Sequence, residues 1–96
     1  MMLSDERFLK ALRAISGPNR LEIIRLVSQK QGEEGVSCAT VLQDLGVSQS
    51  TLSHHVSELR EAGVLIGVPD GRMVRLSINR ELMDQVRERL AGLGET

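Results

Sequence analysis

The chain has 96 residues, of which 12 are Lys or Arg and 13 are Asp or Glu, so its formal net charge at pH 7 is −1. This near-neutral charge disfavours strong non-specific binding to phosphates, although it does not exclude site-specific binding to DNA. With one Phe and no Trp or Tyr, the chain lacks the aromatic side chains that stack on unpaired bases. The length predicts a single domain over residues 1–96 with a small core of its own.

Cys38 is the one cysteine of the chain, so an intramolecular disulfide is excluded and a reducing compartment is favoured. We expect a cytoplasmic protein, because charged residues occupy the N-terminal segment where a signal peptide would need an apolar stretch. No apolar run approaches the roughly 20 residues that span a bilayer, so no membrane association is expected.

The N-terminal half of the chain predicts three helices. Apolar side chains recur at helical spacing over residues 5–16, until Gly17 and Pro18 break the pattern. Pro18 suits the first position of a second helix that extends to about Gln31. After a polar loop, Ser37 is the expected N-cap of a short third helix.

The next segment predicts a helix-turn-helix. Gly46 ends the third helix, Val47 follows, and Ser48 caps a fourth helix from Ser48 to Ala62. Such a short turn holds two helices at a steep angle, which lets the second enter the major groove of DNA. We therefore interpret Ser48 to Ala62 as a recognition helix.

Two short apolar runs, 64–68 and 73–78, flank a turn that contains Asp70 and Gly71, which is a strong hairpin signal. Asn79 is the expected N-cap of a final helix over about 79–92. The predicted fold is therefore mainly α with a small β-hairpin, a winged helix-turn-helix of four helices, two strands and a fifth helix.

The recognition helix directs small or hydrogen-bonding side chains away from its apolar stripe. Helical geometry places Ser50 and His54 opposite the stripe, with the others on its flanks. We predict that Gln49, Ser50, Ser53 and His54 read bases and that Thr51 mainly contacts the phosphates or the minor groove of the DNA. The alternative is a surface helix with an ordinary polar N-terminus.

The hairpin is predicted to be the wing, which contacts the DNA backbone or the minor groove. Arg72 at its tip and Arg75 further along the strand are expected to project from the same face. Arg60, near the end of the recognition helix, is predicted to contact phosphate. The alternative is that it only stabilises the C-terminus of the helix through the helix dipole. Arg75 also fits a routine position on a solvated hairpin.

These segments resemble the ArsR/SmtB family of bacterial metal- and stress-responsive repressors, over about residues 8–90. The most specific similarity is SQSTLSHHVSELREAGVL at 48–65, supported by similar segments at 17–24 and 71–76. The resemblance implies a homodimer joined by the first and last helices, binding to a double-stranded operator, and repression relieved by an inducer.

The terminal helices, about 5–16 and 79–92, also carry apolar stripes that a chain of this size is not expected to bury fully by itself. The predicted dimer-interface residues are Phe8, Leu9, Leu12, Leu82, Met83, Val86 and Leu90.

No metal site, cofactor or enzymatic activity is predicted. The resemblance places the metal-binding cysteines of some relatives at Ser37 and Ala39, and one thiol between them cannot replace two or three. The zinc ligands of other relatives lie on the last helix, which has no His here, and adjacent His54 and His55 point about 100° apart. Cys38 is more typical of a small buried residue than of a redox thiol.

We favour a sequence-specific DNA-binding repressor that is released by an unidentified signal. The balanced charge leaves a second hypothesis open, a winged-helix module that binds proteins rather than DNA. A third is a regulator whose small-molecule ligand lies between the terminal helices and the core.

Overall fold

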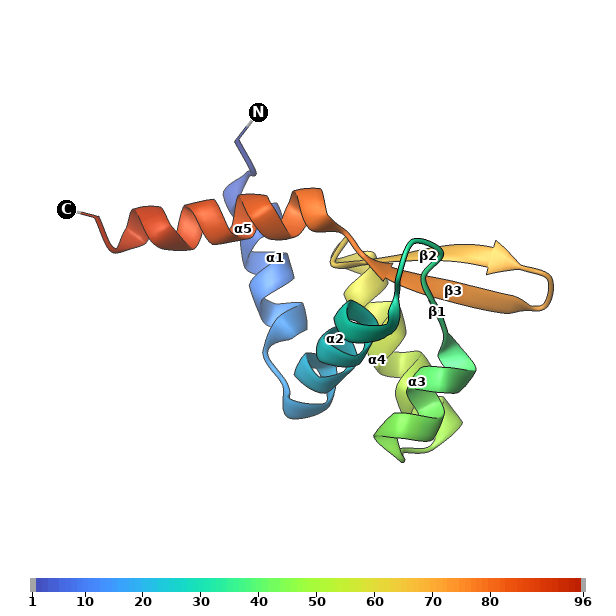
Figure 1. The fold of residues 1–96 in the computed structure, drawn as a ribbon. Coiled ribbons are helices and arrows are strands. Elements are labelled where there is room, and N and C mark those ends of the chain that lie inside the picture. The colour runs from blue at the N-terminus through green and yellow to red at the C-terminus, as the bar shows by residue number, and fades with distance from the viewer. Residues whose placement is uncertain (1, 96) are drawn as a thin grey trace.

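The computed structural model describes residues 2–95, in which five helices and three strands form a winged helix-turn-helix (Figure 1). The predicted fold class is confirmed. The elements are α1 (Asp5–Ile15), α2 (Pro18–Lys30), β1 (Val36–Ser37), α3 (Cys38–Leu45), α4 (Gln49–Glu61), β2 (Leu65–Asp70), β3 (Met73–Ile78) and α5 (Arg80–Leu93).

Local capping chemistry fixes the helix boundaries. Ser37, Ser48 and Asn79 each accept a hydrogen bond from a backbone N–H in the first turn of the helix that follows. Pro18 occupies the start of α2, where its missing N–H costs nothing. Gly46 ends α3 with a φ of +72°, which favours glycine, so the turn before α4 is as short as the sequence predicts.

The sheet has a third strand that the sequence pattern does not predict. Its strand order is β1-β3-β2, with every neighbouring pair antiparallel. β1 pairs Val36 with Leu76 and Ser37 with Arg75, and α3 begins directly after it. The hairpin of β2 and β3, called the wing from here on, turns through Gly71 and Arg72 and points away from the helices (Figure 1).

One apolar core joins the helices to the base of the wing. Within it α2 packs against both α3 and α4, so the helix-turn-helix is supported from behind. Figure 1 shows α5 and the wing extending toward opposite ends of the molecule, whose long dimension is 46 Å. The largest fully buried side chains are Ile23, Leu59, Leu76, Leu82, Val27, Val41 and Val64.

The terminal helices bury more of their apolar stripes within one chain than the sequence predicts. Phe8, Leu82 and Val86 are only 5%, 2% and 3% exposed within one chain, because α1 and α5 pack into the chain's own core, so these three side chains leave little surface for a second copy. Leu9 and Leu90 remain 48% and 47% exposed. The other two residues of the predicted set, Leu12 and Met83, are partly buried.

None of the helices within residues 2–95 combines the length and the apolar character needed to cross a bilayer.

Candidate nucleic-acid interface

The N-terminus of α4 is shaped by its capping serine. The Ser48 hydroxyl accepts from the Thr51 backbone N–H at 3.2 Å and donates to the Thr51 hydroxyl at 2.8 Å. The Ser50 hydroxyl lies 3.3 Å from the Ser48 hydroxyl oxygen. Thr51 is half-buried and held in this cap, whereas Gln49 and Ser50 are exposed. The cap therefore presents these two side chains at the first turn of the recognition helix.

A groove of about 820 Å³ separates the recognition helix from the wing. We call it the α4–wing groove. Its polar lining comes from α4 and from the tip of the wing, and comprises Gln49, Ser53, Ser57, Arg60, Glu61 and Arg72. Its apolar lining comprises Leu42, Leu52, Val56, Met73 and Val74, together with Cys38 and Ala39 at the start of α3.

The groove brings together four of the predicted DNA-binding residues and adds one that was not predicted. Gln49, Ser53, Arg60 and Arg72 all line it. Ser57 lies beside them, and the signal was present in the sequence, because positions 49, 53 and 57 follow one another at the four-residue spacing of a helix face. Ser50, Thr51 and His54 lie outside the lining.

Arg60 is positioned by a glycine of the wing. Its guanidinium lies so close across β2 that a Cβ built on Gly67 would be 2.6 Å from Cζ and from Nε. Within the part of the chain that the structure describes, neither Arg60 nor Arg72 takes part in an ion pair. Both guanidinium groups therefore remain available to an anion at the edge of the groove.

The position of Arg75 differs from the predicted one, on the same face of the wing as Arg72. Its Nε donates to Asp70 at 3.0 Å and its Nη1 donates to the backbone carbonyl of Gly35 at 3.2 Å. Arg75 is also three positions from Arg72, so the alternation of a strand does not place the two on one face. Arg75 braces the wing against β1, and its charge is already satisfied within the chain.

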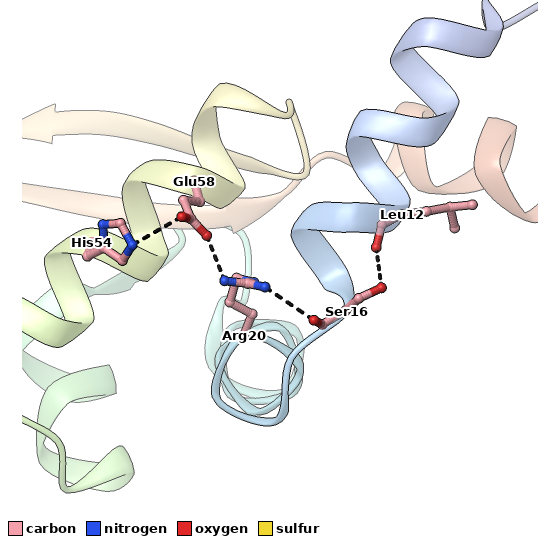
Figure 2. Close-up of polar contacts among 5 residues, drawn as sticks. All are labelled: Leu12, Ser16, Arg20, His54 and Glu58. Atoms are coloured by element: carbon pink, nitrogen blue, oxygen red, sulfur yellow. Dashed lines mark hydrogen bonds and ion pairs between the residues drawn. The ribbon is translucent and has the colours of Figure 1, made fainter.

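His54 and Glu58 connect the recognition helix to α2 (Figure 2). His54 Nε2 lies 3.1 Å from one carboxylate oxygen of Glu58, and Arg20 Nη1 donates to the other at 2.6 Å. Arg20 Nη2 also donates to the Ser16 carbonyl at 3.2 Å. Two of the three acidic groups in the 48–76 segment are thus paired within the chain, Glu58 with Arg20 and Asp70 with Arg75. The groove itself is lined by two arginines, Arg60 and Arg72, and by one carboxylate, that of Glu61.

Comparisons with known proteins agree with this geometry. A helix-turn-helix domain family matches residues 15–68. The arsenical resistance operon repressor of Staphylococcus xylosus is 32% identical over 89 residues, which cover 92% of this chain and 81% of the relative.

The chain belongs to the ArsR family.

Two further similarities support the assignment of this chain to the ArsR family. The HTH-type transcriptional regulator YgaV of Escherichia coli is 28% identical to it over 86 residues, which cover 90% of this chain and 84% of that protein. A crystal structure of an ArsR family transcriptional regulator has the same fold, with a TM-score of 0.82 at 18% identity, covering 99% of this chain and 94% of the other. The protein is therefore a DNA-binding transcriptional regulator, and a module that binds only proteins is not favoured.

Cys38 lies in the groove of this ArsR family regulator without a close thiol partner, since it is the one cysteine of the sequence. Burial raises the pKa of its thiol, and the positive charge of Arg60 lowers that pKa only in part. Among residues 2–95, no three His, Cys, Asp or Glu side chains cluster in a way that could hold a metal ion.

Proposed function

We propose that this ArsR family regulator is a repressor that binds a double-stranded operator as a homodimer and is released by an inducer. The first turns of α4 enter the major groove, and the wing follows the adjacent backbone. The observation that carries this proposal is the α4–wing groove, which hydrogen-bonding side chains of the recognition helix line together with two arginines that form no ion pair within residues 2–95.

The side chains divide by chemistry into base readers and backbone contacts. Gln49 offers both a donor and an acceptor, the pattern that reads adenine, and Ser50 and Ser53 hydrogen-bond to several base edges. Arg60 and Arg72 neutralise phosphates on either side of the groove. Thr51 supports the cap and does not read bases, because its hydroxyl already pairs with Ser48. Its contact with DNA is limited to the sugar-phosphate backbone.

The homodimer is proposed from apolar surface on the terminal helices. Leu9 on α1 is 48% exposed, and Leu90 and Leu93 on α5 are 47% and 69% exposed. A second copy packed on these leucines would bury them and would bring two recognition helices to successive major grooves, about 34 Å apart. The proposed site of action is the bacterial cytoplasm, where the operator is located.

Selection of bound duplexes from a random pool, followed by gel shifts, tests operator binding. We expect a palindromic site and a salt-sensitive shift that resists non-specific competitor. Ser50→Ala should weaken the shift about three- to ten-fold, the value of one hydrogen bond. Ser28→Ala, an exposed serine on α2, is the matched control and should not. Absence of any sequence-selective shift by the intact protein would refute the proposal.

A further inference from the structure

A line of polar contacts links the C-terminal end of α1 to the recognition helix (Figure 2). It runs from the Ser16 carbonyl through Arg20 and Glu58 to His54. Exposure of the side chains rises along this line, from 20% for Arg20 to 39% for Glu58 and 69% for His54. One end is thus held by the protein, and the other is presented to solvent on the recognition helix.

Arg20 forms the fixed end. Its Nη1 and Nη2 are hydrogen-bonded to Glu58 and Ser16, respectively. Its Nε is buried, and a Cβ built on Gly17 would come within 3.1 Å of Nη2. A planar guanidinium fixed at two nitrogens and packed against the backbone holds the Glu58 carboxylate in one place.

The Glu58 carboxylate in turn determines which nitrogen His54 offers to a ligand. Nε2 lies 3.1 Å from Oε1 of Glu58. A carboxylate has only lone pairs to present, so an unprotonated Nε2 at this distance would be repelled. The neutral ring therefore carries its proton on Nε2 and leaves Nδ1 as a hydrogen-bond acceptor on an exposed side chain.

We propose that Arg20, acting through Glu58, positions His54 so that its Nδ1 accepts a hydrogen bond from the exocyclic amino group of adenine or cytosine in the major groove. This inference rests on the proposed binding of an operator by α4. In the major groove the amino groups N6 of adenine and N4 of cytosine are the donors, whereas guanine and thymine present acceptors. An acceptor on His54 therefore selects between bases.

The same arrangement argues against a phosphate as the partner of His54. The unprotonated Nδ1 and a phosphate oxygen both present lone pairs and no proton, so they would repel one another. A neutral amino group on a base edge meets no such repulsion. Arg20 is a positioning residue in this scheme, because its guanidinium faces Glu58 and Ser16 and not the DNA.

The acceptor role is tested on the selected operator at pH 8. His54→Ala should remove the preference at one base pair of each half-site and weaken binding about three- to ten-fold. Replacing the adenine or cytosine at that pair by an analogue without its amino group should weaken binding of the unaltered protein equally. The same analogue should not affect the His54→Ala variant. An analogue that leaves the unaltered protein's affinity unchanged would overturn the acceptor role.

A double-mutant cycle tests the action of Arg20 through His54. Arg20→Met should weaken operator binding about three-fold or more in the otherwise unaltered protein, and should have no further effect when His54 is already alanine. Arg25→Met is the matched control, because Arg25 also lies on α2 and pairs with a carboxylate, that of Glu22, at 3.2 Å. We expect that variant to bind the operator normally.

A second variant keeps the cycle decisive if Arg20→Met does not fold. Glu58→Gln preserves the shape of the side chain but removes the charge that pairs with Arg20 and fixes the ring, and its effect should likewise vanish in the His54→Ala background. Equal effects of these variants in both backgrounds would refute positioning through His54. If His54→Ala alone leaves affinity and base preference unchanged, the reading role of His54 is wrong while operator binding stands.

Discussion

Replacing Gly35 by alanine should destabilise the protein far more than replacing Gly46. Both glycines adopt positive φ, +85° for Gly35 and +72° for Gly46. An alanine in the left-handed region destabilises the folded state by about 1–2 kcal/mol. Alanine also reduces the conformational entropy of the unfolded chain, which offsets about 0.4–1 kcal/mol of that cost. At Gly46 nothing else lies within 4 Å of the new Cβ, so we expect the free energy of unfolding to fall by about 1 kcal/mol there.

At Gly35 the new Cβ would also lie 2.9 Å from the carbonyl oxygen of Leu76. That oxygen belongs to β3, which pairs with strands on both sides, so it cannot move aside without disturbing the sheet. Overpacking of this kind costs about 1–3 kcal/mol. The free energy of unfolding should therefore fall by about 2–4 kcal/mol in total.

Thermal unfolding followed by circular dichroism measures both effects. For a chain of this size about 1 kcal/mol shifts the Tm by roughly 4–8 °C, so Gly35→Ala should lower the Tm by roughly 8–32 °C and Gly46→Ala by about 4–8 °C. Both variants must be compared at one protein concentration, because dimerisation raises the apparent stability. Equal decreases at the two positions would show that the clash with β3 is absent.

Three further predictions concern the wing, the thiol and the terminal helices. Arg72→Ala should reduce the slope of log K against log salt by about 0.9 for each phosphate that its guanidinium neutralises, whereas Arg75→Ala should leave that slope unchanged and lower the Tm instead; filter binding over a salt series separates them. Cys38 should react with iodoacetamide at pH 8 more slowly in the folded protein than in urea, because its raised pKa leaves less thiolate; an equal rate would contradict this burial. Leu90→Glu should produce a folded monomer in size-exclusion chromatography and Leu21→Glu, also exposed at 40%, an unaltered dimer; the proposed interface is wrong if the first variant remains dimeric.

Features governed by neighbouring residues were predictable from the sequence. The caps at Ser37, Ser48 and Asn79, the start of α2 at Pro18 and the turn at Gly46 all depend on residues within one helical turn, and the structure confirms each. The order of the helices and the hairpin followed from them. The positions within the site that follow from helical periodicity, such as Gln49 and Ser53, were likewise found.

Features that depend on distant residues were missed. β1 has two residues and pairs with a strand almost 40 positions later, so it leaves no periodic pattern. The hydrogen bond between Arg75 and the Gly35 carbonyl, and that between Arg20 and Glu58, join segments that only the fold brings together. An apolar stripe also does not reveal what covers it: Phe8 is packed under Arg89, whose Cζ lies 4.4 Å from the ring centroid.

The short strand β1 has a mechanical consequence. It ends at Ser37, and α3 begins at Cys38 with no residue between them. Since β1 is also paired with β3, main-chain hydrogen bonding fixes the position of the helix-turn-helix relative to the wing. Neither of the two can shift far without moving the other or breaking that pairing. A signal that displaces the start of α3 would therefore release the DNA from the recognition helix and from the wing together.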